Sequence, residues 1–307
     1  MDEGAFVSEQ QPHISVCICT YKRPELLKRC LESVCALRTD NQLTYSIVVV
    51  DNDGNESARS TVAEASAISS IACKYCIEPR QNIAMARNKA VQNAEGDYIA
   101  FIDDDEFPIE EWLLTLLKAI HKYNAAGVLG PVDPHYAPGT PGWIIKGGFY
   151  ERPIHTTGMI LQWNKCRTGN VLLRRGLFAN DTAPFKPECL SGEDQDFFRR
   201  KIEEGHKFIW CHEAVAYEVV PPARWKRGFL IRRALFRGIF AQRNHGLQPL
   251  RLIQAVISVP LYALILPIAL ALGQARFMVC LFKLSYHAGR LFALFGFNPI
   301  GGAYVSE

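Results

Sequence analysis

Short apolar runs recur along the first part of the chain, and segments with helical spacing separate them. Residues 14–20, 47–51 and 98–102 are predominantly apolar, which is typical of strands buried on both faces of a parallel sheet. Over 24–35 the apolar side chains recur every three to four residues, and Pro24 stands where helices often begin. This alternation predicts an α/β fold with a parallel sheet and right-handed crossovers.

The rest of the predicted sheet is less regular. A short strand is expected over 74–78, a helix over about 83–94, and a further helix from Pro108. Further along, the pattern predicts strands over 126–132, 170–173 and 208–217, and a glycine- and proline-rich loop over 131–148.

The pattern changes after Pro221. Over 224–243, arginine and lysine alternate with aromatic and aliphatic residues, as in amphipathic helices that lie on anionic lipid. Residues 252–273 carry no charge and are long enough to cross a bilayer, and membrane-spanning helices tolerate their two prolines. Residues 277–297 are apolar but interrupted by charges, which favours an amphipathic or half-inserted helix. A buried hairpin of core helices is the alternative to a membrane segment.

Charge divides the chain at the same place. Between Glu218 and Glu307 there are eleven basic residues and no acidic ones, whereas the first 218 residues hold 30 acidic and 23 basic residues. Basic residues before a span favour the cytoplasmic side, and an uncharged run disfavours nucleic acid as the partner. We therefore expect an α/β domain over 1–220, basic interfacial helices over 221–251 and membrane-associated helices over 252–307.

The cysteines suggest no structural metal. Cys73 and Cys76 form a lone C-x-x-C pair with no second pair to complete a zinc site. The chain begins without a basic and then apolar signal sequence, so reduced cysteines in the cytosol are expected.

Three consecutive carboxylates, Asp103, Asp104 and Asp105, directly follow the run at 98–102. Their mutual repulsion is costly unless a cation neutralises it, and oxygen ligands suit Mg²⁺ or Mn²⁺. A solvated acidic turn that caps the next helix is the alternative. Residues 20–23 and Asp51 also follow predicted strands, and polar groups at the carboxyl ends of parallel strands converge on one ligand-binding edge. The chain has no G-x-G-x-x-G after the first strand and no P-loop.

A second acidic cluster, Glu193-Asp194-Gln195-Asp196, opens a predicted helix. Acidic residues are stabilised at a helix N-terminus by the macrodipole. Taken alone, this cluster is compatible with simple helix capping.

The ordered set of motifs resembles family 2 glycosyltransferases with the GT-A fold, especially bacterial exopolysaccharide glucosyltransferases of the succinoglycan type. The resemblance covers roughly residues 12–240. The motifs that carry it are Val16-Cys17-Ile18-Cys19-Thr20-Tyr21-Lys22-Arg23-Pro24, Val49-Val50-Asp51-Asn52, Asn82-x-x-x-x-Arg87-Asn88, Gly96-Asp97-Tyr98, Phe101-x-Asp103-Asp104-Asp105 and Gly192-Glu193-Asp194-x-Asp196-Phe197.

The resemblance implies a site for a nucleotide sugar. The residues it places on the donor nucleotide are Thr20, Tyr21, Arg23, Asp51, Asn82, Arg87, Asp103 and Asp104, although it names no contact for Asp104. Asp105, together with Asp103, would hold Mg²⁺ or Mn²⁺ on the diphosphate. Asp194 would be the general base that deprotonates the acceptor hydroxyl, with Glu193 on the acceptor side.

Two departures from the family pattern are visible. Where many relatives have a histidine near the end of the last strand, this chain reads Ala216-Tyr217-Glu218, and His212 lies several residues earlier. The Gln-x-x-Arg-Trp motif of processive synthases is absent, which favours the addition of single sugars.

The resemblance therefore implies an inverting, metal-dependent transferase that uses a nucleoside-diphosphate sugar, with UDP-sugars expected first. The expected acceptor is a lipid-linked saccharide at the cytoplasmic face of the plasma membrane. Two alternatives remain at this stage: a nucleotidyltransferase acting on sugar phosphates, and a non-catalytic, membrane-tethered protein that binds nucleotide sugars.

Overall fold

The computed structural model describes residues 11–179, 181–189, 192–245 and 249–297, and the chain divides into two compact units. The first unit comprises Met1–Asp133 and Arg152–Glu218. The second comprises Pro134–Glu151 and Val219–Glu307.

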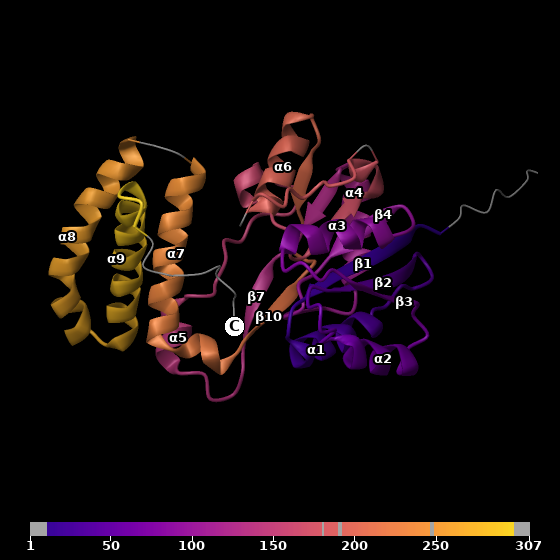
Figure 1. The fold of residues 1–307 in the computed structure, drawn as a ribbon, viewed down its shortest axis with the longest axis horizontal. Coiled ribbons are helices and arrows are strands. Elements are labelled where there is room, and N and C mark those ends of the chain that lie inside the picture. The colour runs from indigo at the N-terminus through magenta and orange to yellow at the C-terminus, as the bar shows by residue number, and fades with distance from the viewer. Residues whose placement is uncertain (1–10, 180, 190–191, 246–248, 298–307) are drawn as a thin grey trace, which may run out of the picture. The chain divides into compact units, whose positions relative to one another are not determined.

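The first unit is built on a sheet whose described strands follow the order β3-β2-β1-β4-β8-β6-β9. Figure 1 labels the first four of them, β3, β2, β1 and β4. Neighbouring strands from β3 to β4 are parallel, β8 runs antiparallel to β4 and β6, and β9 is parallel to β6. The predicted parallel α/β sheet is thus confirmed, with one antiparallel strand inside it. The strand bounds are β1 His13–Thr20, β2 Thr44–Asp51, β3 Cys73–Ile77, β4 Tyr98–Phe101, β6 Gly127–Leu129, β8 Val171–Arg174 and β9 Phe208–Trp210.

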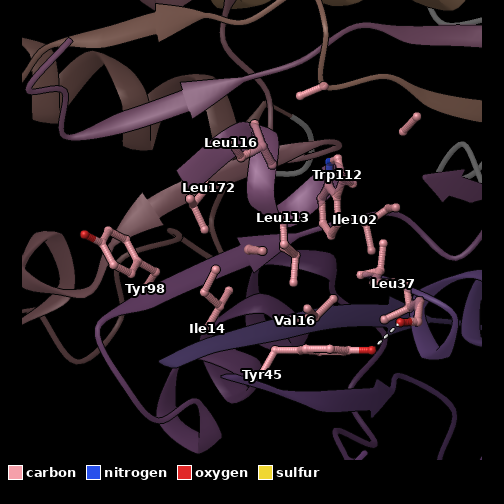
Figure 2. Packing of buried hydrophobic residues seen from close by; sticks show 14 of the residues in the cluster. Ile14, Val16, Leu37, Tyr45, Tyr98, Ile102, Trp112, Leu113, Leu116 and Leu172 are labelled. Atoms are coloured by element: carbon pink, nitrogen blue, oxygen red, sulfur yellow. Dashed lines mark hydrogen bonds between the residues drawn. The ribbon is translucent and has the colours of Figure 1, made fainter. Parts of the chain in front are cut away.

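Helices cover both faces of this sheet because its central strands alternate buried side chains between two cores. Ile14, Val16 and Ile18 of β1 pack into one core with α1, α2 and α4, whereas Cys17 belongs to the other core with α3 and α6. In the first core, shown in Figure 2, the buried Tyr45 donates a hydrogen bond of 2.9 Å to the Val34 carbonyl. The helix bounds are α1 Pro24–Cys35, α2 Arg59–Ile68, α3 Ile83–Asn93, α4 Trp112–Lys122 and α6 Glu193–Glu203, with short 3₁₀ turns η1 Trp163–Lys165 and η2 Arg175–Phe178.

A second, small sheet and the segments next to it differ from the secondary structure predicted for them in three places. It has the order β5-β10-β7, with bounds β5 Glu106–Pro108, β7 Val132–Tyr136 and β10 Ala216–Val220. Pro108 was expected to begin a helix, but it ends β5. The loop expected at 131–148 contains β7 and α5 (Gly142–Gly147). The single strand expected over 208–217 is divided into β9 and β10. The reason is local: these strands are three to five residues long, too short for their periodicity to be recognised.

The second unit is helical over most of its described length. Its helices are α5, α7 Arg227–His245, α8 Pro249–Ala271 and α9 Gln274–Leu294, with the 3₁₀ turn η3 Pro222–Trp225. A small core formed by Ile144, Phe149, Leu230 and Met278 joins α5, α7 and α9. Among the described residues, α8 and α9 are long and apolar enough to cross a membrane by length and composition.

Candidate active site

The predicted site residues of the first unit gather at the carboxyl ends of β1, β2 and β4. Thr20 at the end of β1 is the register partner of Asp51 at the end of β2, and the acidic loop 103–105 follows β4 on the other side of β1. The three strands are adjacent and parallel, so the loops after them share one edge of the sheet.

The three aspartates of the acidic loop have different surroundings. Asp104 is buried and accepts hydrogen bonds from Thr20 Oγ1 (2.7 Å) and Arg23 Nη1 (3.2 Å), and Arg23 also lies 3.6 Å from Asp105. Burial raises the pKa of Asp104 to about 7, against the charge of Arg23. The side chain of Asp103 is 48% exposed, compared with 6% for Asp104. Asp104 therefore anchors the loop to β1, and Asp103 is the aspartate most open to a ligand.

Asp51 is also fully engaged within the protein. Its carboxylate accepts hydrogen bonds from the backbone N–H groups of Asp53 (3.0 Å) and Ala58 (2.7 Å) and from the Tyr75 hydroxyl (2.8 Å). These bonds shape the loop between β2 and α2. A contact of Asp51 with a nucleotide stays a prediction.

Two other residues predicted to contact the donor nucleotide, Tyr21 and Asn82, lie in adjoining loops. Asn82 caps α3 by accepting a hydrogen bond from the Met85 N–H (3.2 Å), and its amide donates to the Pro187 carbonyl (3.0 Å). Tyr21 follows β1 in a half-buried position, with the Lys22 ammonium 5.1 Å from its ring centre. Asn82 thereby connects the start of α3 to the segment that precedes α6.

A buried ion pair connects the acidic loop to α6. Arg87 of α3 bonds directly to Glu193 at the start of α6, and its other terminal nitrogen lies 3.7 Å from Asp103. Both Arg87 and Glu193 are almost fully buried. The arginine expected to contact phosphate thus already bridges two carboxylates from the two acidic clusters.

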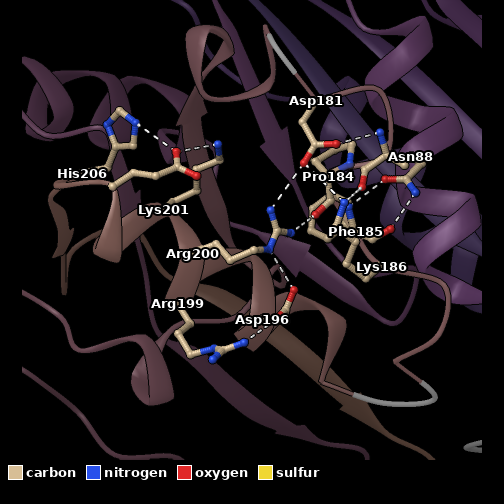
Figure 3. A network of polar contacts seen from close by, with 12 residues as sticks. Asn88, Asp181, Pro184, Phe185, Lys186, Asp196, Arg199, Arg200, Lys201 and His206 are labelled. Carbon is tan, nitrogen blue, oxygen red and sulfur yellow. Dashed lines mark hydrogen bonds and ion pairs between the residues drawn. The ribbon is translucent and has the colours of Figure 1, made fainter.

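The acidic residues at the start of α6 divide into different roles. Asp196 accepts hydrogen bonds from Arg199 and Arg200, which lower its pKa although burial opposes the charge (Figure 3). Glu193 is paired with Arg87. Asp194 is half-buried, and within the described part of the chain its carboxylate receives a bond only from the Gln195 N–H (2.7 Å).

The pKa of Asp194 is suited to proton transfer near neutral pH. Burial and, secondly, the charge of Glu193 raise the pKa of Asp194 to about 6, while Arg87 opposes the rise. A carboxylate with such a pKa is ionised at pH 7 and remains a useful base. Ion pairs with Arg199 and Arg200 account for Asp196, and no such partner accounts for Asp194 among the described residues.

No group of three or more His, Cys, Asp or Glu side chains that could hold a metal ion occurs among the described residues. The predicted donor set is two carboxylates, Asp103 and Asp105, on one loop. This fits Mg²⁺ or Mn²⁺, which commonly bind through one or two carboxylates and complete their shell with phosphate oxygens and water.

A buried charge cluster behind the acidic loop could not be read from the sequence. Glu106 of β5 and Glu218 of β10 are register partners on antiparallel strands, and Arg152 pairs with both, 3.8 Å from Glu106 Oε1. Burial and the charge of Asp103 raise the pKa of Glu106 well above its usual range. The Asp103 N–H donates to Glu106 Oε2 (3.3 Å), so this cluster supports the acidic loop from behind.

Gly169 and Asn170, which follow each other in the chain, lie close to this charge cluster and to the strands around it. A Cβ at Gly169 would lie 2.8 Å from Glu106 Oε1 and 3.0 Å from Asp103 Oδ2, so any larger residue would press on the acidic loop. Asn170 accepts a hydrogen bond from Trp112 Nε1 (2.7 Å) and donates to the Pro131 and Ala214 carbonyls. The Gly-Asn pair carried no signal in the sequence because all its partners are distant along the chain.

An open α/β sheet with carboxylates and an arginine gathered at the carboxyl ends of its strands is the arrangement of nucleotide-binding α/β proteins. Residues 15–177 match the family model "Glycosyl transferase family 2", and the chain belongs to this family. It is a glycosyltransferase, as its motifs predicted.

Individual relatives agree with this assignment. The chain is 35% identical over 244 residues to succinoglycan biosynthesis protein ExoM of Rhizobium meliloti (strain 1021), covering 77% of this chain and 78% of that protein. It is 31% identical over 207 residues to a glucosyl-dolichyl phosphate glucuronosyltransferase of Haloferax volcanii, covering 66% of this chain and 61% of that one.

A solved structure shows the same fold. The mannosyltransferase PcManGT from Pyrobaculum calidifontis, in complex with GDP-Man and Mn²⁺, has a TM-score of 0.64 to this chain at 18% identity, covering 94% of this chain and 88% of that one. The predicted GT-A fold is confirmed.

Proposed function

We propose that this protein is an inverting, metal-dependent glycosyltransferase of surface or exopolysaccharide synthesis. It moves a hexose from a nucleoside-diphosphate sugar, with UDP-sugars as first candidates, to a hydroxyl of a lipid-linked saccharide. The observation that carries the proposal is Asp194: it is the carboxylate at the start of α6 whose side chain is not taken up by an arginine, and its pKa is raised to about 6. Through Glu193 and Arg87 it is linked to the acidic loop.

The chain's own residues supply positioning and proton transfer. The edge formed by the ends of β1, β2 and β4 would hold the nucleotide, and Asp103 and Asp105 would hold the divalent ion. When bound, that ion supplies positive charge for the diphosphate that leaves. Asp194 accepts the proton of the acceptor hydroxyl, whose oxygen forms a bond to the anomeric carbon while the bond to the nucleoside diphosphate breaks. A single displacement without a carboxylate nucleophile inverts the configuration at that carbon.

The nature of the acceptor follows from the relatives and from the second unit. ExoM is named for succinoglycan biosynthesis, and the Haloferax enzyme is named for transfer to a lipid-phosphate-linked sugar. The basic helix α7 and the apolar helices α8 and α9 suit work at a membrane surface on the cytoplasmic side. A saccharide on a lipid carrier is the acceptor that fits both.

A donor panel tests the proposal. UDP-, GDP- and dTDP-sugars are incubated with the full-length protein, Mn²⁺ and a membrane lipid extract, and the released nucleotide and labelled lipid product are measured. We expect a nucleoside diphosphate and a glycosylated lipid from one donor class. Release of pyrophosphate in a parallel incubation with a nucleoside triphosphate and a sugar phosphate would indicate nucleotidyl transfer, and donor binding without any product would indicate a binding protein; either result contradicts the proposal.

A further inference from the structure

The helices α7 and α9 of the second unit lie side by side with their backbones in close contact. A Cβ at Gly238 of α7 would lie 2.0 Å from the Tyr286 carbonyl oxygen of α9. Gln242 of α7 accepts a hydrogen bond from Arg290 of α9 (3.2 Å). In both pairs the α9 residue is 48 positions after its α7 partner, so the two helices run parallel and share one direction.

The helix α7 carries charges that oppose a transmembrane orientation. Arg232 and Arg237 lie in its middle and are exposed, and Arg243 near its end is exposed as well. Gly238, which faces α9, is buried, and so is Ala234 one turn before it, so the exposed Arg232 and Arg237 lie away from this face. Each charge at a bilayer centre is strongly disfavoured, and α7 therefore cannot cross a membrane on its own.

The helix α9 shares the orientation of α7 because the two are in close parallel contact. It also carries polar residues, which suit a position between the lipid headgroups and the centre of a bilayer. Ser285, His287 and Arg290 are buried between helices, and Lys283 in its middle is exposed.

The helix α8 packs against α9 and turns a broad apolar surface outward. Tyr262 of α8 stacks with His287 of α9, and the Cys280 thiol of α9 donates to the Tyr262 carbonyl (3.4 Å). Figure 1 shows α9 between α7 and α8. Mean hydropathy rises from 1.2 in α9 to 2.1 in α8. The exposed large apolar residues of α8 are Leu250, Ile253, Val256, Ile257, Leu261, Leu264, Ile265, Ile268 and Leu270.

We infer that the three helices lie flat within one leaflet of an anionic bilayer instead of crossing it. α7 places its arginines among the lipid phosphates, α9 lies beneath it, and α8 lies deepest, among the acyl chains. Packed helices are about 8–10 Å apart, so the axis of α8 lies roughly 16–20 Å below that of α7; with α7 at the outer edge of the headgroup region, α8 lies within the hydrocarbon half of the leaflet, which is about 15 Å thick. The inference goes beyond the proposed transfer reaction and does not depend on it.

Insertion depth along α8 tests the inference. A nitroxide is attached through an unnatural amino acid at Leu250, Ile257, Leu264 and Ala271 in turn, so that the ten native cysteines remain in the full-length protein. These positions are exposed and seven residues apart, and they share one face of the helix. The protein is bound to vesicles of phosphatidylcholine with phosphatidylglycerol, and accessibility to oxygen and to an aqueous nickel complex gives the depth of each label.

A flat helix places all four labels at similar depth within the acyl chains. A crossing helix, about 30 Å long from Leu250 to Ala271, places the two end labels near the surfaces and the two central labels deepest. That profile would overturn the inference. Labels that remain accessible to the aqueous quencher on vesicles would also overturn it, because α8 would then face water.

The headgroup position of α7 is tested separately. Arg232→Gln and Arg237→Gln should each weaken binding to the anionic vesicles by about fivefold, with little effect on neutral vesicles. Lys118→Gln, which changes an exposed cation of the first unit, serves as the control and should leave vesicle binding unchanged. Unchanged binding of the arginine variants to anionic vesicles would contradict the headgroup position.

Discussion

The ion pair between Arg87 and Glu193 makes a specific prediction about both stability and catalysis. Arg87→Met leaves Glu193 buried beside Asp194 without its cation. The two side chains of the pair are only 10% and 6% exposed, so solvent cannot replace the lost partner. Removing one member of such a pair costs about 3–5 kcal/mol, whereas an exposed pair contributes about 0–1 kcal/mol. We therefore expect a loss of several kcal/mol in the free energy of unfolding.

The same change should shift the pH dependence of the reaction. In the wild-type protein, kcat/KM should fall as the pH decreases through about 6, because protonation of Asp194 removes the base. Arg87 opposes the rise in the pKa of Asp194, and its removal raises that pKa further. The acid limb of the profile should then move to higher pH.

Urea unfolding and pH profiles of kcat/KM provide the assays. The double variant Arg87→Met/Glu193→Leu should recover much of the stability, because a neutral apolar pair replaces an unpaired charge. Arg175→Met, at an exposed arginine, is the matched control. If Arg87→Met unfolds at the wild-type urea concentration and keeps the wild-type acid limb, the reasoning from this pair is refuted.

Three further predictions concern the acidic loop. Asp105→Ala should weaken Mn²⁺-dependent binding of UDP or GDP at least tenfold in calorimetry, while binding without metal changes little; equal loss with and without Mn²⁺ would argue against a metal role. Gly169→Ala should cost about 1–3 kcal/mol in thermal unfolding because its Cβ meets Glu106 and Asp103, whereas Gly176→Ala, whose Cβ meets nothing within 4 Å, should be nearly neutral. Arg152→Met removes the cation that lies beside the buried Glu106 and Glu218 and should destabilise the protein by about 3–5 kcal/mol; an unchanged melting temperature would contradict this role of Arg152.

The central strands could be predicted because burial on both faces leaves a continuous apolar run. β1, β2 and β4 follow this rule, and their carboxyl ends correctly located the acidic loop and Asp51. β5 and β10 could not be predicted in the same way. Their side chains alternate over only a few residues, and their pairing joins positions about one hundred residues apart.

The site could be predicted as a set of residues but not as a set of partners. The sequence does not indicate that Asp104 accepts hydrogen bonds from Thr20 and Arg23. These two bonds supply the contact of Asp104 that the sequence could not name. Arg87 was assigned to phosphate on its charge, and its bond to Glu193 depends on how α3 and α6 pack. Both contacts arise from tertiary packing, which a single sequence does not encode locally.

The central claim is that Asp194 is the base of a glycosyl transfer. The most direct measurement compares Asp194→Asn with Asp196→Asn, a neighbouring change of the same chemistry at a carboxylate held by two arginines. Transfer to the lipid acceptor and donor affinity are measured for both variants. We expect that Asp194→Asn loses transfer by at least a thousandfold and keeps donor affinity, and that Asp196→Asn retains most of its transfer. Transfer by Asp194→Asn near the wild-type rate would contradict the claim.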